Sequence, residues 1–139
     1  MDNTGSEIGN TTKSVVLGHP DLLIGQGISA ILAKANYEVV GTANTEATLK
    51  DLAWKHKPDI ILFEPAISDS YVGVISEFRK KIPKSVVSLI TKKGTFNGIP
   101  QAIKAGASGC ISVDTSSERF TRLLQSLLPA FDSCGVHAG

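Results

Sequence analysis

The chain has 139 residues, a length that suits one domain, and 42% of them are hydrophobic, which is enough for a single core. The formal net charge of +1 argues against a broad nucleic-acid-binding surface. No apolar run approaches the roughly 20 residues that a membrane-spanning helix needs, so the composition predicts one globular domain without a membrane segment.

The two ends of the chain differ in character from its middle. The N-terminus, MDNTGSEIGNTTK, is polar and lacks the basic-then-apolar order of a signal peptide, so we expect a disordered leader over residues 1–12 and a cytoplasmic protein. Residues 13–129 are expected to form the domain, and residues 130–139 a flexible tail or the start of a linker. Cys110 is expected to fill a small buried space and Cys134 to lie in the tail, with no metal site and no disulfide.

Short apolar runs alternate along the chain with segments whose apolar residues recur at helical spacing. Strands are predicted over residues 14–17, 37–42, 60–63, 86–90 and 109–113, with Thr91 closing the fourth. A helix is predicted after each strand: from the cap Asp21 to about residue 35, then 44–56, 72–82, a short helix with Pro100 in its first turn, and a last helix that Pro129 closes.

The helices are predicted to turn one apolar face inward. In the first helix this face consists of Ile24, Ile28, Ile31 and Leu32, and in the last helix of Phe120, Leu123, Leu124, Leu127 and Leu128. The last helix is predicted to begin with a capping box, in which Thr115 bonds a free N–H and Glu118 reaches back. The second strand alternates more than the others, which favours a place at the sheet edge.

The repeated order of strand and helix predicts the fold class. Apolar strands separated by helices indicate a parallel sheet covered on both faces. Right-handed crossovers then give a doubly wound five-stranded α/β sheet with five helices, of the flavodoxin-like kind. In such sheets the working site lies beyond the carboxyl ends of the strands, which here are Leu17-Gly18, Thr42, Glu64, Thr91 and Val113.

Several short stretches resemble one known family when they are taken in order. His19-Pro20 follow the first strand, KPDIILFEP surrounds the third, Thr91 closes the fourth, and AGASG leads into the fifth. Together they resemble the receiver domain of bacterial response regulators, the modules that receive the signal in two-component systems and phosphorelays. The resemblance is strongest to receivers of LuxR/NarL-type regulators and covers residues 13–128.

The resemblance implies a site whose usual side chains are mostly replaced. In the family, two acids and an aspartate hold magnesium, and this aspartate accepts the phosphoryl group. A threonine and a lysine contact the phosphoryl oxygens, and an aromatic residue changes rotamer when the site is filled. By resemblance the two acidic positions fall on Leu17 and Gly18, the acceptor on Glu64, the lysine on Val113 and the aromatic residue on Cys110. Thr91 is the one of these positions that has the residue type of the family.

A receiver with these replacements is expected to be a pseudo-receiver with a degenerate phosphorylation site. An incoming phosphoryl dianion would meet the Glu64 carboxylate without the usual counter-charges. Lys92 and Lys93 follow Thr91 and are interpreted as solvated loop charges. We expect no enzymatic activity, no metal and no cofactor, and a Glu64 side chain that bonds either Thr91 or nearby backbone N–H groups.

The first functional hypothesis is a phosphorylation-independent regulatory or dimerisation module of a transcription regulator. It would contact a protein partner or a second copy of itself, and DNA would be bound only by an output domain that this chain does not contain. The resemblance leaves two dimer faces open. One is built by the fourth helix, the fifth strand and the last helix, and the other by the first and last helices.

Two alternatives stay open. In the first, the receiver fold senses a small molecule in a pocket lined by Leu17, Cys110 and Val113, with Glu64 and Thr91 as polar anchors. In the second, Glu64 still accepts a phosphoryl group.

Three other side chains are interpreted as structural. His19 is expected to pack on the helix that follows it, and the spacing of the histidines indicates no metal site. Trp54 is expected to be partly buried, and Phe96 to pin the loop that carries it.

Overall fold

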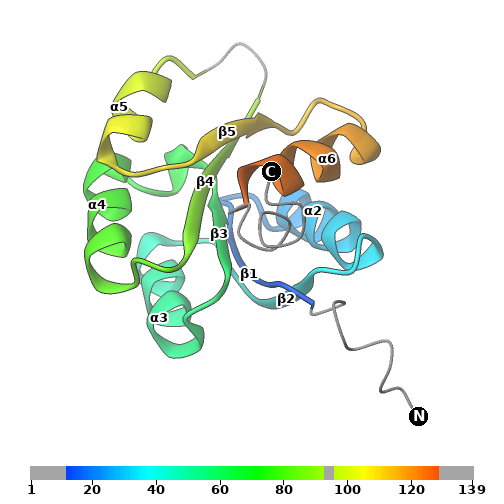
Figure 1. Ribbon diagram of the computed structural model, residues 1–139, viewed down its shortest axis with the longest axis horizontal. Helices are drawn as coiled ribbons and strands as arrows, with labels where there is room; N and C mark the ends of the chain where they lie inside the picture. Colours follow the sequence, from blue (N-terminus) through cyan, green and yellow to red (C-terminus); the bar gives the residue numbers. More distant parts are fainter. Residues whose placement is uncertain (1–11, 93–95, 129–139) are drawn as a thin grey trace, which may run out of the picture.

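The computed structural model describes residues 12–92 and 96–128, in which strands alternate with helices (Figure 1). The strands are β1 (Ser14–Gly18), β2 (Glu38–Ala43), β3 (Ile60–Phe63), β4 (Val86–Thr91) and β5 (Gly109–Ser112). The helices are α2 (Leu22–Lys34), α3 (Glu46–His56), α4 (Tyr71–Lys81), α5 (Ile99–Ala105) and α6 (Ser117–Leu127), and a 3₁₀ turn, η1 (Pro65–Ile67), follows β3. The predicted strands and helices are all present, and η1 is the element that the sequence did not predict.

The strands form one parallel sheet in the order β2-β1-β3-β4-β5. Figure 1 shows α2 and α6 on one face of this sheet and α3, α4 and α5 on the other. The doubly wound five-stranded α/β fold predicted from the sequence is therefore confirmed, and β2 lies at the sheet edge as predicted.

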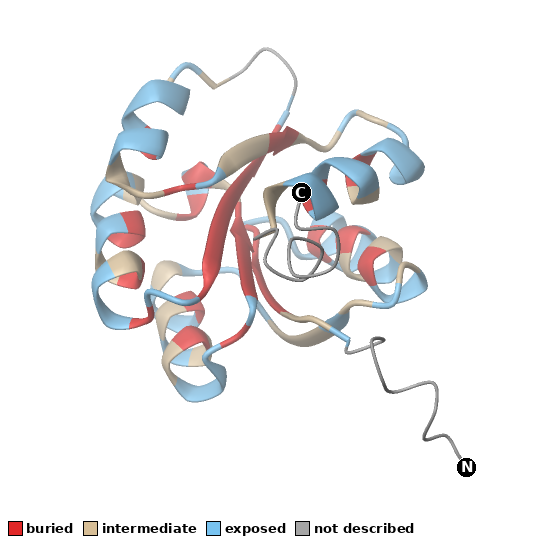
Figure 2. Ribbon diagram, viewed as in Figure 1, coloured by how far each residue is buried: buried red, intermediate tan, exposed pale blue. Residues whose placement is uncertain are grey.

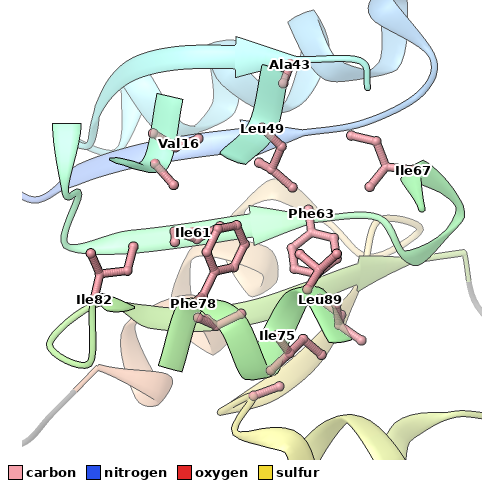
Figure 3. Close-up of a cluster of buried hydrophobic side chains, with 14 of the residues drawn as sticks. Val16, Ala43, Leu49, Ile61, Phe63, Ile67, Ile75, Phe78, Ile82 and Leu89 are labelled. Carbon is pink, nitrogen blue, oxygen red and sulfur yellow. The ribbon is translucent and has the colours of Figure 1, made fainter. Parts of the chain in front are cut away.

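The central strands are buried on both faces, because helices cover both (Figure 2). Toward α3, α4 and α5, the ring of Phe78 meets that of Phe63 edge to face, with centroids 6.2 Å apart, inside the cluster drawn in Figure 3. Toward α2 and α6, Leu17 packs in a second cluster with Leu32 and Leu124. Neighbouring strand residues point to opposite faces, so each strand contributes to both clusters.

Side-chain caps begin three of the helices. Asp21 Oδ1 accepts hydrogen bonds from the N–H groups of Leu23 and Ile24, at 2.9 and 3.1 Å, as predicted. Thr45 caps α3. The predicted cap of α6 is wrong by one residue, because Ser116 rather than Thr115 accepts from the backbone at the start of α6. The stretch TSS offers consecutive hydroxyl groups, and local preference does not choose among them.

Two residues predicted to face the core lie at the surface instead. Ile24 is 38% exposed, because the first turn of α2 lies over the strand ends rather than over the sheet. Leu123 is 36% exposed, because α6 buries the narrow stripe formed by Phe120 and Leu124. A helix that covers a sheet edge needs fewer inward residues than one between two layers.

Two aromatic side chains lie as predicted. Trp54 is partly buried and packs edge to face on Phe78, at 5.4 Å between centroids. Phe96 packs in the same way on Tyr71, at 5.3 Å, and so ties its loop to the first turn of α4.

Several predictions concern residues outside the described ranges: the disordered leader up to residue 11, Lys93, the stop at Pro129, and the tail with Cys134. Within the described ranges, no helix is long and apolar enough to cross a membrane.

The turn after α5 depends on a glycine. Gly106 has a φ of 123°, a conformation that residues with a side chain rarely adopt. A Cβ at this position would collide with Cγ of Arg79, whose Nη1 donates a hydrogen bond to the carbonyl of Ser85 at 2.8 Å. Both the backbone conformation and the space therefore require glycine here.

We predict that Gly106→Ala lowers the free energy of unfolding by about 1–3 kcal/mol, because it combines backbone strain with a steric clash. Gly27→Ala is the matched control, since a Cβ at Gly27 in α2 meets no atom within 4 Å. The control is expected to stabilise the chain by about 0.5–1 kcal/mol. Urea unfolding followed by circular dichroism measures both, and equal stability of the two variants would contradict the role of Gly106.

A small ion cluster joins α3 to α4. Lys50 Nζ lies 3.0 Å from a carboxylate oxygen of Glu46 and 2.9 Å from one of Glu77. The hydrogen bond from Ser68 and then the contact with Lys50 lower the pKa of Glu46 below its ordinary 4.5. The contact with Lys50 is also the first cause that lowers the pKa of Glu77. Carboxyl groups with lowered pKa values stabilise the folded state above pH 4.5, and this contribution is lost as the pH falls through the folded pKa.

We predict that acidification from neutral pH to about pH 3.5 destabilises the wild-type chain more than Lys50→Met, because the variant no longer holds the two pKa values down. Lys55→Met, in the exposed last turn of α3, is the control and should lose as much stability as the wild type. The measurement is urea unfolding at both pH values. The effect is small, since water still reaches both carboxylates, whose side chains are 34% exposed in Glu46 and 32% exposed in Glu77. An unchanged acid response in Lys50→Met would refute the coupling.

Candidate functional site

The carboxyl ends of the central strands meet at one edge of the sheet. The N–H of Glu64, the residue after β3, donates to the carbonyl of Gly18 at 3.0 Å. The N–H of Val113, the residue after β5, donates to the carbonyl of Thr91 at 2.8 Å. These bonds continue the ladders past the strand ends, so the residues that the sequence analysis singled out lie at the same edge.

A pocket of about 290 Å³ opens at this edge. It is lined by His19, Ile24, Glu64, Thr91, Lys92 and Val113. Its size lies at the lower end of the range for small-molecule sites. Larger open grooves of about 790 and 510 Å³ run along β2, where Thr42 lines the groove, and between α2 and α6, and neither is lined by Glu64, Thr91 or Val113.

Glu64 acts as the cap of η1. Its Oε1 accepts a hydrogen bond from the N–H of Ala66 at 2.8 Å, and Pro65 occupies the first position of the turn. This outcome matches the predicted bond to a nearby backbone N–H. A Glu64–Thr91 hydrogen bond, the other option, is not among the interactions of the described residues.

Thr91 is paired with a different residue. Its Oγ1 lies 3.4 Å from Sγ of Cys110, and either atom can be the donor. Burial raises the pKa of the Cys110 thiol above its ordinary 9.0, the bond with Thr91 opposes this rise, and the charge of Glu64 adds to it. Cys110 is half-buried on β5 and packs against the core cluster, so the prediction that it fills a small buried space is right only in part. A neutral thiol bonded to Thr91 occupies the position at which the resemblance implies an aromatic residue.

The two positions where the resemblance implies acids are filled by the core. Leu17 is fully buried among residues of α2 and α6, so the prediction that it lines the pocket is wrong. Gly18 is buried as well, and a Cβ there would lie 3.0 Å from Leu49 Cδ1 and 3.1 Å from Ile67 Cδ1. A carboxylate at residue 18 would therefore need its neighbours to move.

Cys110 is also absent from the pocket lining, although the small-molecule hypothesis placed it there. Of the residues named in that hypothesis, Glu64, Thr91 and Val113 do line the pocket. Val113 also packs against the cluster that contains Leu17, toward α2 and α6, whereas Cys110 packs against the cluster on the other face.

His19 packs against α2, as predicted, and is buried. Its Nδ1 accepts a hydrogen bond from the N–H of Asp21 at 3.0 Å. A ring nitrogen that accepts a hydrogen bond carries no proton. The imidazole ring of His19 is therefore neutral and holds its proton on Nε2. His19 also lines the pocket and can present a donor there.

His19, Ile24 and Lys92 also line the pocket, and the sequence reasoning placed none of the three there. Ile24 was assigned to the core by its helical spacing, and Lys92 was interpreted as a solvated charge. The signal that would have found Lys92 is its place directly after Thr91, at a strand end that points to the same edge. No cluster of three or more metal-ligating side chains of the His, Cys, Asp or Glu type occurs in the described part of the chain.

Comparison with known proteins gives a consistent result at the level of structure. No protein-family model matches the chain, and no curated protein matches it. Among solved structures, the receiver domain of the response regulator NarL from Mycobacterium tuberculosis aligns with a TM-score of 0.75 and 23% identity, over 83% of this chain and 94% of that one.

Two further solved structures give the same result, and one of them is a LuxR-family regulator. A LuxR-family DNA-binding response regulator from Staphylococcus aureus has a TM-score of 0.73 and 13% identity, over 83% of this chain and 98% of that one. The isolated receiver of RcsB from Salmonella enterica serovar Typhimurium, solved with the phosphomimetic BeF3−, has a TM-score of 0.73 and 14% identity, over 84% and 88%. The chain thus has the fold of response regulator receiver domains, as the resemblance implied.

We predict that Gly18→Asp lowers the free energy of unfolding by about 2–4 kcal/mol, because it forces a charged side chain against Leu49 and Ile67. Gly18→Ala adds the Cβ without the charge, so it measures the steric part alone, and it should lower the free energy of unfolding by about 1 kcal/mol. Thermal and urea unfolding of both variants provide the test. A fully stable Gly18→Asp protein would mean that the neighbouring side chains yield and that an acid fits at this position.

Proposed function

We propose that this chain is a pseudo-receiver, a regulatory module that has the receiver fold, takes no phosphoryl group and has no enzymatic activity. It would act in the cytoplasm within a transcription regulator of the LuxR type, through contact with a second copy or another protein. DNA binding would belong to an output domain outside this chain.

The observation that carries this proposal is the packing at Gly18. The place where a metal-binding acid would be needed is closed by Leu49, Ile67 and Phe63, each of which has an atom within 3.1 Å of the point where a Cβ on residue 18 would lie. The preceding residue, Leu17, is buried in the core on the other face. Hard cations such as Mg²⁺ prefer several oxygen ligands, and among the residues that line the described pocket Glu64 is the one with a carboxylate.

The charges of the pocket support the same conclusion. Phosphoryl transfer depends on positive groups that neutralise the phosphoryl oxygens. Val113 is an apolar wall of the pocket, and Lys92 is the cation there. Glu64 lines the same pocket, and its carboxylate repels a dianion. The pocket is thus poorly suited to phosphoryl transfer.

The pocket itself favours a second candidate function, the sensing of a small molecule. It is partly enclosed, and it combines the apolar side chains of Ile24 and Val113 with polar groups, the combination that ligand sites share. In this function the ligand would replace phosphorylation as the input.

The decisive experiment is an amide NMR titration of the chain with magnesium, followed by magnesium with beryllofluoride, which imitates a phosphoryl group on an acceptor carboxylate. The pseudo-receiver proposal predicts that the amides of Gly18, Glu64 and Thr91 keep their shifts through both additions. The isolated receiver of RcsB, whose structure was solved with BeF3−, is the positive control.

Saturable shifts at Glu64 that disappear in Glu64→Gln would overturn the proposal and establish Glu64 as a live phosphoacceptor. Glu38→Gln, at the exposed start of β2, is the matched control for the loss of one carboxylate. It should leave any shifts unchanged.

A further inference from the structure

The pocket at the strand ends presents opposite charges to one small space. Glu64 follows β3 and Lys92 follows β4, and both line the pocket. With His19 neutral, the formal charges of the lining cancel. A pocket whose lining has no net charge repels neither anions nor cations. Its two charged side chains can still orient a ligand that has one positive and one negative group.

The Glu64 carboxylate is incompletely satisfied. Its Oε1 accepts from the Ala66 N–H, and Glu64 takes part in no ion pair among the described residues. The side chain is half-buried, so water reaches it only in part. A carboxylate has room for about four hydrogen bonds, and a desolvated one gains most from a charged donor such as an ammonium group.

Other residues of the lining offer donors for an anionic group. Lys92 lines the pocket with an exposed side chain, and Thr91 and His19 line it as buried polar residues. Because Nδ1 of His19 accepts from Asp21, the proton on Nε2 is available as a donor. Thr91 adds a hydroxyl group whose bond to Cys110 is long, at 3.4 Å, and can reorient.

The remaining walls and the volume limit the size of the ligand. Ile24 and Val113 supply apolar contact, and a volume of about 290 Å³ admits a small metabolite but not a nucleotide with its base, sugar and phosphates. The ligand is therefore compact, partly apolar and charged at two points.

We infer that this pocket binds a small zwitterion of amino-acid size, whose ammonium group pairs with Glu64 and whose carboxylate faces Lys92, Thr91 and His19. The side chain of the ligand lies against Ile24 and Val113. The inference deepens the sensing function, and it rests on the proposed function because the pocket must be free of a phosphoryl group.

The test uses the purified chain and a panel of the L-amino acids, each at about 10 mM, a concentration that reveals millimolar dissociation constants as a rise in melting temperature. Any amino acid that raises it is compared with its two halves: for L-valine these are isobutylamine, which lacks the carboxylate, and 3-methylbutanoate, which lacks the ammonium group. The zwitterion should bind about tenfold or more tightly than either half, as measured by calorimetry, because each half forfeits one charged contact.

Two variants assign the ends of the ligand. Glu64→Gln should weaken binding of the zwitterion about tenfold and leave binding of the carboxylate half unchanged. Lys92→Met should also weaken binding of the zwitterion about tenfold, but it should leave binding of the amine half unchanged. Glu38→Gln and Lys104→Met change exposed residues far along the chain and should bind like the wild type. The inference is overturned if no amino acid raises the melting temperature, or if Glu64→Gln binds the zwitterion as tightly as the wild type.

Failure of this inference is distinguishable from failure of the proposed function. Inorganic phosphate and magnesium with beryllofluoride form a separate arm of the same experiment. Stabilisation by beryllofluoride would overturn the pseudo-receiver proposal together with this inference. Absence of stabilisation by both beryllofluoride and amino acids would overturn the inference alone.

Discussion

The burial of the central strands on both faces is the constraint on which the rest of the structure depends. Residues of β1, β3 and β4 alternate between two packed clusters, so almost every side chain within them is apolar. A buried polar group without a partner is costly, and chemistry can therefore enter only where the strands end. Glu64 and Thr91 are placed at those ends. The site therefore lies at the strand ends, because the buried parts of the strands are occupied by apolar side chains.

At this edge, apolar packing occupies the two positions where the resemblance implies acids. Leu49 and Ile67 close the space beside Gly18, and Leu17 is turned into the opposite cluster. Glu64 then serves a structural purpose as the cap of η1, while one side of its carboxylate still faces the pocket. Thr91 is bonded to the thiol of Cys110. The pocket beside them is small, and its lining combines Glu64 and Lys92 with apolar side chains.

The fold was predictable because its signals are local and repeated. Apolar runs of strand length, helical spacing between them and caps such as Asp21 each report on a few neighbouring residues. The wrong predictions concern a helix cap, for which several neighbouring residues were equally suitable, and a helical turn that extends past the edge of the sheet. Thr115 and Ser116 precede α6 and Ser117 begins it, and of these three hydroxyl residues Ser116 forms the cap. Ile24 fits an inward helical stripe, yet the turn that carries it extends past the sheet and lines the pocket.

The sequence by itself determined the strand–helix order, the parallel sheet, and the delivery of Glu64, Thr91 and Val113 to one edge, because chain direction and residue pattern suffice for each. Only the tertiary structure decided which neighbours meet there. It turned Leu17 and Cys110 toward the packed faces, brought His19 and Lys92 to the pocket, and filled the space beside Gly18. These outcomes depend on side-chain direction and on contacts between residues far apart in the chain, such as Gly18 and Leu49, and no local pattern encodes them.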